Sequence, residues 1–294
     1  MSDVVCFGEV LWDLLPHGRF LGGAPLNVAY HLKRLGRSPR LVSAVGDDAL
    51  GAEALVLIAR AGLPTTTIAH HATLSTGSVG VRLDEKGQAV YEIHRPVAWD
   101  EITARPGGNA GDGEISALVF GSLALRGVEN RAVLRAWLAA TSGLKVCDLN
   151  LRPPFDAVEE LEEFIHGCSL LKVNGDEART LAPKELGAAD VESHAAHLAA
   201  KYACAMVCVT LGAEGALLWR EGKIYRASSP LVTVRDTIGS GDSFTAALLD
   251  GILRGETKPD WEALLARACA LGAFVASRDG AQPEYAPAEV PGLA

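Results

Sequence analysis

Residues 236–242 read Asp-Thr-Ile-Gly-Ser-Gly-Asp, which places two glycines and two carboxylates close together. Phe244, Leu248 and Ile252 follow at intervals of four, a spacing that predicts a helix with one buried face beginning at the glycines. Free backbone N–H groups and the positive end of the helix dipole favour an anion at such an N-terminus, and glycine allows it to approach closely. The segment therefore predicts an anion site.

Asp242 adds a carboxylate to this anion site, and two interpretations are open. As a capping or first-turn acid it would only stabilise the start of the helix. As a base it would orient a hydroxyl group that attacks a bound phosphate and would accept its proton. Asp236 is, in the same way, either a turn former or a cation ligand.

Other polar residues stand where expected strands end or where a helix begins. Because the carboxyl ends of parallel strands meet at one edge of an open sheet, these residues are expected to converge there. They are Gly22, Gly23 and Asn27 before and within a helix, Asp148, Asn150 and Arg152 after one strand, Asn174 and Glu177 after the next, and Thr210, Gly212 and Gly215 after a third.

Several chemistries are not expected from this sequence. It has no G-x-x-x-x-G-K-[ST], so a Walker-type phosphate site is not expected, and no G-x-G-x-x-G follows the first strand, which disfavours a dinucleotide site. It also has no H-E-x-x-H zinc-binding motif. The six cysteines form no C-x-x-C pair and are expected to be reduced core residues. A net charge of −9 makes nucleic-acid and anionic-membrane partners unexpected. With no signal segment and no apolar run long enough to span a bilayer, we expect a soluble, cytoplasmic protein.

The elements that must position these residues alternate between strand-like and helix-like segments. Apolar runs predict strands at 4–8, 41–45, 118–120, 145–149, 170–173, 205–211 and 231–234. Helical patterns separate them at 26–35, 49–61, 129–141 and 191–202, and a further helix follows the last strand from Phe244 and ends near Gly255. Buried strands separated by helices predict an α/β fold with a mostly parallel sheet that is covered on both faces.

Residues 66–99 interrupt this alternation. Segments 76–83 and 88–95 are rich in strand-forming residues, and the Asp-Glu-Lys-Gly between them at 84–87 predicts a turn and hence a hairpin. A hairpin inserted in an α/β chain of 294 residues is expected to serve as a lid rather than a second domain. We therefore expect one domain over residues 1–294, with lid strands inserted at about 10–22 and 66–99.

Taken together, these motifs resemble the PfkB/ribokinase family of carbohydrate kinases over essentially the whole chain. Residues 236–244 match the family's C-terminal D-T-x-G-x-G-D signature, the Gly-Gly at 22–23 with Asn27 matches its N-terminal signature, and Asn174-x-x-Glu177 matches its N-x-x-E element. The resemblance implies a ribokinase-like α/β fold with a small β lid. It also implies transfer of the γ-phosphate of MgATP to a sugar hydroxyl.

The resemblance further implies roles for individual residues. Asp242 would be the catalytic base, with the backbone of Gly239, Ser240, Gly241 and Asp242 as the anion hole. Nucleotide-site residues would be Thr210, Gly212, Gly215 and Gly241, together with Asn174 and Glu177, which would order Mg²⁺ through water. Asp236 and the carbonyl of Ile238 would belong to a monovalent-cation site that takes K⁺. The sugar would be held by Asp13, Gly22, Gly23, Asn27, Arg95, Asn150 and Arg152.

Within the family the chain is most similar to bacterial fructokinases, which make fructose 6-phosphate from D-fructose. The alternatives are 2-keto-3-deoxygluconate kinase or another sugar or nucleoside kinase of the family, and, from a different class, a non-catalytic sugar or nucleotide sensor. The expected partners are a small sugar and MgATP. The lid strands have too little core of their own to stand alone, and the family resemblance implies that a homodimer formed through the lid covers them.

Overall fold

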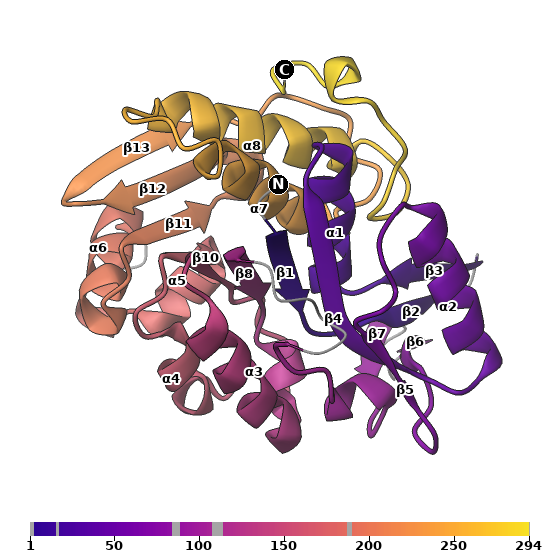
Figure 1. The fold of residues 1–294 in the computed structure, drawn as a ribbon. Coiled ribbons are helices and arrows are strands. Elements are labelled where there is room, and N and C mark those ends of the chain that lie inside the picture. The colour runs from indigo at the N-terminus through magenta and orange to yellow at the C-terminus, as the bar shows by residue number, and fades with distance from the viewer. Residues whose placement is uncertain (1–2, 16–17, 84–88, 108–113, 187–189, 294) are drawn as a thin grey trace.

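A computed structural model describes residues 3–15, 18–83, 89–107, 114–186 and 190–293 (Figure 1). Its centre is a nine-stranded sheet in the order β13-β12-β11-β10-β9-β8-β1-β4-β5. The seven strands from β11 to β5 run parallel, and β12 and β13 are antiparallel additions at one edge. The strands are β1 (Asp3–Phe7), β4 (Ser38–Gly46), β5 (Ile68–His71), β8 (Ile115–Phe120), β9 (Leu144–Asp148), β10 (Leu170–Asn174), β11 (Met206–Thr210), β12 (Ala216–Arg220) and β13 (Lys223–Ala227).

Helices cover both faces of this sheet, as the continuous apolar strands predict. Alternate residues of β1 point to opposite faces: Val4 and Cys6 belong to one buried cluster, whereas Val5 and Phe7 belong to the other. The first cluster includes α1 (Ala24–Arg34), α2 (Ala49–Arg60), α7 (Ser240–Ile252) and α8 (Trp261–Ala276). The second includes α3 (Val128–Ala140), α4 (Glu162–Ile165), α5 (Gly175–Leu181) and α6 (Val191–Tyr202). The predicted α/β class is confirmed.

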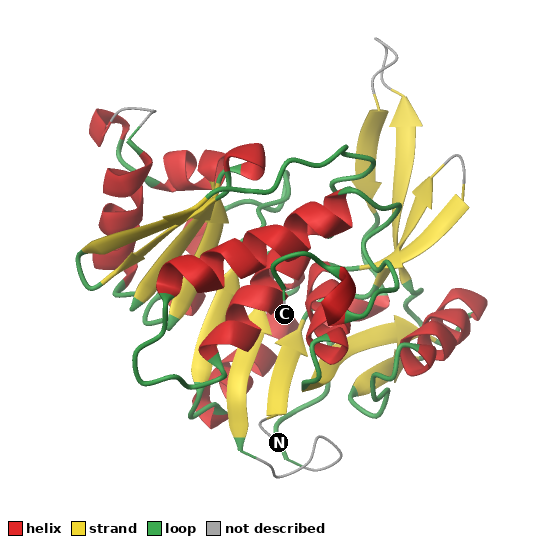
Figure 2. Ribbon diagram, turned by 90° about the horizontal axis from the view of Figure 1, so that it is seen from above, coloured by secondary structure: helices red, strands yellow, loops and turns green. Residues whose placement is uncertain are grey.

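A second, four-stranded sheet stands at one end of the main sheet (Figure 2). It has the order β3-β2-β6-β7 and consists of β2 (Leu11–Leu15), β3 (Gly18–Gly22), β6 (Gly77–Leu83) and β7 (Ala89–Ile93). β6 and β7 pair antiparallel, and the turn expected at 84–87 lies outside the described residues. β5, which falls within residues 66–99, pairs with β4 in the main sheet instead.

The strand predicted at 231–234 is wrong, and the hairpin β12–β13 was not expected. Residues 228–237 have no regular secondary structure, and Leu231 and Val234 are 97% and 58% exposed. Strand-forming residues adopt a strand only where a neighbour supplies hydrogen-bond partners and apolar contacts. Here β13 already forms the sheet edge, and the chain leaves it through Ser228–Pro230.

Short 3₁₀ helices complete the described chain. They are η1 (Ala98–Glu101), η3 (Leu123–Arg126), η4 (Val158–Glu160), η5 (Lys184–Leu186), η6 (Gly212–Glu214) and η7 (Pro287–Glu289). Among the described helices, none has both the length and the apolar character that crossing a bilayer requires.

Candidate active site

A cavity of about 470 Å³ lies between the carboxyl ends of the central strands, the N-terminus of α7 and the small sheet. The small sheet contributes Leu11 and Asp13 from β2, Val79 from β6 and Ile93 from β7. The lining includes nine of the residues that the sequence analysis singled out: Asp13, Gly23, Asn27, Asn150, Arg152, Ile238, Gly239, Gly241 and Asp242. The structure thus brings together residues from both ends of the chain.

Two of the predicted sugar-binding residues, Gly22 and Arg95, are not part of the cavity lining. Gly22 lies next to Asp13, as shown by a β-carbon built on Gly22, which would lie 2.9 Å from the Oδ2 atom of Asp13. Arg95 places its guanidinium over the ring of Phe155, 5.4 Å from the ring centre.

The N-terminus of α7 has the form expected of an anion site. Gly239 is its N-cap residue with φ of 77°, and a β-carbon there would lie 2.5 Å from that of Ala281. The Ser240 hydroxyl donates to the carbonyl of Gly272 on α8, at 3.0 Å, so this side chain is turned away from the cavity. The backbone N–H groups of Gly241 and Asp242 belong to the first turn, where the helix itself supplies no acceptor.

Asp242, in the first turn of α7, has a carboxylate poised for proton transfer. Its Oδ2 atom accepts a hydrogen bond from the Asn27 amide at 2.8 Å. Burial raises the pKa of Asp242 to about 7, and the nearby charge of Asp148 acts in the same direction. The Asn27 hydrogen bond and the charge of Lys172 oppose this increase in pKa. The carboxyl group therefore changes its protonation state near neutral pH, as a general base should.

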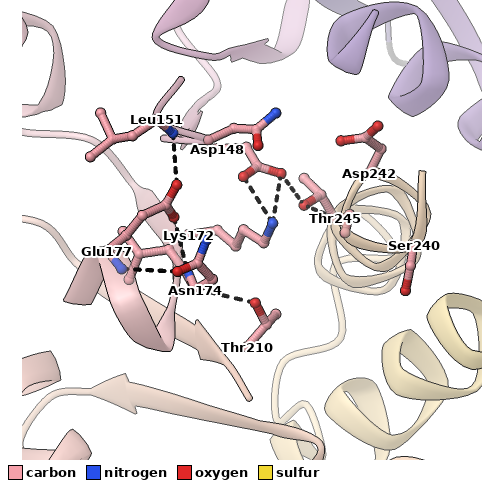
Figure 3. Close-up of polar contacts among 12 residues, drawn as sticks. Asp148, Leu151, Lys172, Asn174, Glu177, Thr210, Ser240, Asp242 and Thr245 are labelled. Carbon is pink, nitrogen blue, oxygen red and sulfur yellow. Dashed lines mark hydrogen bonds and ion pairs between the residues drawn. The ribbon is translucent and has the colours of Figure 1, made fainter. Parts of the chain in front are cut away.

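A buried ion pair lies beside Asp242 (Figure 3). Lys172 on β10 donates to both carboxylate oxygens of Asp148 on β9, at 2.9 and 3.1 Å, and the Thr245 hydroxyl on α7 donates to Asp148 Oδ2 at 2.7 Å. Lys172 also lines the cavity. Lys172 was not among the residues predicted from the sequence, although a lysine inside the apolar strand Leu170–Asn174 was a signal.

Glu9 is a second residue that the sequence analysis did not assign to the site. It is 4% exposed, lines the cavity, and accepts a hydrogen bond from the Ala24 backbone N–H at 3.0 Å. Burial raises its pKa, as it raises the pKa of Asp13 to about 6, and the charge of Arg152 lowers both. An acid inside the apolar segment after the first strand was the available signal.

The residues expected to hold the nucleotide lie along the ends of β10 and β11. Asn174 and Thr210 are paired in register at those ends. Asn174 Oδ1 accepts from the Glu177 N–H at 2.9 Å, while the two carboxylate oxygens of Glu177 accept from the N–H groups of Asn174 and Leu151, at 2.8 and 2.7 Å (Figure 3). A β-carbon on Gly212 would meet only open space, whereas Gly215 packs tightly against the carbonyl of Ala227.

The oxygen-rich chemistry at Asn174 and Glu177 fits hydrated Mg²⁺, which prefers oxygen ligands and retains several waters. Both Glu177 oxygens already accept backbone hydrogen bonds, so a water-mediated contact suits this carboxylate better than direct coordination. Within the described parts of the chain, no three His, Cys, Asp or Glu side chains gather into a metal-binding group.

Comparison with known proteins identifies the family of this chain. The model of the pfkB family of carbohydrate kinases matches residues 1–288. The chain belongs to this family. It is 30% identical to the fructokinase of Escherichia coli over 269 residues, which cover 85% of this chain and 84% of that protein. It is also 30% identical to the fructokinase of Klebsiella pneumoniae over 292 residues, covering 93% of each chain.

Solved structures of other kinases have a similar fold. A fructokinase from Xylella fastidiosa with bound ATP superposes with a TM-score of 0.82 at 24% identity, covering 95% of this chain and 94% of that one. An aminoimidazole riboside kinase from Salmonella enterica, complexed with its riboside and an ATP analogue, gives a TM-score of 0.78 at 25% identity, covering 96% and 95%. The chain is thus a carbohydrate kinase of the pfkB family with that family's fold.

Proposed function

We propose that this pfkB-family kinase is an ATP-dependent fructokinase that forms fructose 6-phosphate in the cytoplasm. The observation that carries the proposal is Asp242: a carboxylate with a pKa raised to about 7 lies in the first turn of α7, in the cavity and beside the helix's unpaired N–H groups. The curated relatives from Escherichia coli and Klebsiella pneumoniae that carry the name fructokinase support the choice of sugar.

In this mechanism Asp242 aligns the sugar hydroxyl and accepts its proton as the new phosphate ester forms. The transition state of phosphoryl transfer is loose and spreads negative charge over the transferred group, so positioning and charge neutralisation supply most of the catalysis. The N–H groups of Gly241 and Asp242 face that charge at the start of α7. Mg²⁺, held through water by Asn174 and Glu177, would neutralise phosphate charge when bound.

The small sheet is proposed to act as a lid over the sugar. Leu11, Val79 and Ile93 line the cavity together with Asp13. Three apolar side chains and one hydrogen-bonding side chain match a sugar, which presents C–H groups as well as hydroxyls. Excluding water in this way would suppress hydrolysis of ATP.

The acids of the cavity favour a neutral sugar over a keto-deoxy acid. Glu9, Asp13 and Asp242 all line it, and a substrate carboxylate placed near them would be repelled. Arg152 also lines the cavity and is a feature that favours 2-keto-3-deoxygluconate, whereas Arg95 stacks on Phe155 instead. We therefore keep that kinase as the second candidate. A purely sensory protein would not need a base at Asp242.

The deciding experiment measures ADP release with fructose, glucose, ribose, adenosine and 2-keto-3-deoxygluconate at equal concentrations. We expect the highest kcat/KM with fructose, and phosphorus NMR of the product should show a 6-phosphate. A higher kcat/KM with 2-keto-3-deoxygluconate would establish the second candidate, and no turnover with any acceptor would overturn the assignment as a sugar kinase.

A monovalent-cation site is proposed at Asp236 and the carbonyl of Ile238. Asp236 Oδ1 accepts from the Ile238 N–H at 2.9 Å, and Oδ2 accepts from the Gly280 N–H at 3.3 Å, so this carboxylate ties the loop before α7 to the C-terminal segment. A K⁺ ion there would stiffen the loop and add positive charge beside it. We expect faster turnover in K⁺ than in Na⁺, and equal rates would contradict this site.

A homodimer formed through the lid is proposed on the exposed parts of the small sheet. β3 and β7 are its edge strands, and Leu14 on β2 is 37% exposed. Unpaired strand edges and apolar side chains are often covered by a second copy of the chain. Light scattering at micromolar protein should give about twice the chain mass of 30.8 kDa, whereas the single-chain mass at all concentrations would contradict the dimer.

A further inference from the structure

Lys172 is a lysine in the interior of the fold, a place where this residue type is rare. Its side chain runs from the centre of β10 toward α7 (Figure 3). The residue is only 7% exposed. Burial alone would lower the pKa of Lys172, but the charges of Asp148, Asp242 and Glu177 outweigh burial and raise it. A lysine in this setting keeps its positive charge at neutral pH.

The ammonium group of Lys172 lies against the first turn of α7. A β-carbon built on Gly241 would lie 3.0 Å from its Nζ atom. Nζ is held there by Asp148, at 2.9 and 3.1 Å, and Asp148 is held in turn by the Thr245 hydroxyl one turn further along α7. Because strands β9 and β10 and helix α7 all fix this arrangement, the position of the charge is set before any ligand binds.

Stability alone does not explain this ion pair, since two buried charges often stabilise a fold no better than apolar residues of similar volume. Lys172 also lines the cavity that Asn150, Gly241 and Asp242 line. An ammonium group has three donors, and the two contacts to Asp148 leave a third for a ligand in that cavity. The ligand that suits a lysine at a helix N-terminus is a phosphate.

We propose that Lys172 is a catalytic residue that donates a hydrogen bond to the transferred phosphoryl group, and that Asp148 is the residue that positions it. This inference rests on the proposed kinase function. In the transfer, the bond from the γ-phosphorus to the ADP oxygen breaks as the bond to the sugar oxygen forms, and the hydroxyl proton passes to Asp242. Lys172 keeps its protons throughout and balances charge on the group in transit.

The experiment compares Lys172→Met with the double variant Lys172→Met/Asp148→Asn. The single variant leaves the Asp148 carboxylate buried without its cation, so it should lose both thermal stability and activity. The double variant removes both charges and should regain most of the lost stability. We expect kcat of the double variant to stay about 10²-fold or more below that of the wild type, as when a positioned donor is removed, with the sugar KM changed little.

A second measurement does not depend on turnover. Calorimetry in the presence of Mg²⁺ compares the affinities of wild type and double variant for ADP and for a non-hydrolysable ATP analogue. Because Lys172 is proposed to contact the γ-phosphoryl group, the double variant should lose more affinity for the analogue than for ADP. Lys201→Met is the matched control: Lys201, in the last turn of α6, pairs with Glu162 at 2.9 Å and does not line the cavity, so its loss should leave kcat and both affinities unchanged.

The outcomes separate the two proposals. A double variant with wild-type kcat and equal losses for both nucleotides would show that the pair serves stability alone and would overturn the role of Lys172. If the wild type phosphorylates none of the sugars, the proposed function fails, while the difference between the analogue and ADP still tests the contact of Lys172 with the terminal phosphate.

Discussion

The amide of Asn27 donates a hydrogen bond to the carboxylate of Asp242 at 2.8 Å, although 215 positions separate the two residues. α1 and α7 pack side by side, which places the first turn of each at the same point of the cavity. The amide oxygen of Asn27 accepts in turn from Gln282 Nε2, also at 2.8 Å. Gln282 thereby orients the Asn27 amide so that its NH₂ group, not its oxygen, faces Asp242.

This chain of hydrogen bonds predicts a measurable effect of Gln282→Met. Without the donor at 282, the Asn27 amide is free to turn and its hydrogen bond to Asp242, which lowers the pKa of that carboxyl, weakens. The acid limb of the kcat/KM profile should move to higher pH, with activity at pH 7 reduced several-fold. The control Glu284→Ala changes an exposed residue of the same segment and should leave the profile in place. An unmoved acid limb in Gln282→Met would contradict the orienting role.

Asp242→Asn should lower kcat by about 10²- to 10⁴-fold, the range that general-base catalysis usually contributes. Asparagine keeps the shape of the side chain and an oxygen that accepts from Asn27, so fold and substrate binding should be retained. Steady-state kinetics and calorimetry with ADP check this. Asp13→Asn is the comparison, because it should act mainly on the sugar KM. Less than a tenfold loss of kcat would mean that Asp242 is a structural first-turn acid.

The raised pKa of Asp242 also predicts how stability depends on pH. The folded protein holds this proton up to about pH 7, whereas the unfolded chain releases it near 3.8. Stability from this group is therefore complete below about pH 4 and is lost as the pH rises through 7. Burial also raises the pKa values of Glu9 and Asp13, so these two groups change stability with pH in the same direction. The contribution of Asp242 is therefore measured as the difference between the wild type and a variant that lacks its carboxylate. Thermal denaturation of Asp242→Asn should show a smaller fall in Tm between about pH 5 and about pH 8 than that of the wild type, and an identical fall would contradict the raised pKa.

The local sequence was sufficient to predict the main architecture of the fold. The strand Asp3–Phe7 has apolar residues that face both sides of the sheet, and the glycines before Phe244 mark the start of α7. Such patterns depend on the spacing of apolar residues and on the backbone freedom of glycine. Both can be recognised from residues that are close together in the sequence. The segment 231–234 shows the limit: its residues favour a strand, but the sheet already ends at β13.

Partners distant in the sequence could not be predicted in this way. Lys172 and Asp148 become visible as a pair only when β9 and β10 lie side by side, and Gln282 reaches Asn27 across 255 positions. The role expected of Asn174 and Glu177 was taken from a motif, and the structure adds that their side chains cap the start of α5. Packing across the sheet, rather than propensity, determines these contacts.

The two glycines of the loop before α7 should respond differently to substitution by alanine. Gly239 has φ of 77°, which costs a residue with a side chain about 1 kcal/mol, and its β-carbon would lie 2.5 Å from that of Ala281. Gly239→Ala should therefore lower Tm.

At Gly241 a β-carbon meets only the end of the Lys172 side chain, at 3.0 Å, so Gly241→Ala should fold normally. Its methyl group instead occupies the space that a phosphate needs to reach the N–H groups of α7, and valine, which is larger, should have a stronger effect. We expect Gly241→Ala and Gly241→Val to raise the KM for ATP progressively and to lower kcat, with Tm close to that of the wild type. Unchanged kinetics in both Gly241 variants would mean that the phosphate binds elsewhere, whereas a lowered Tm would mean that this glycine serves the fold.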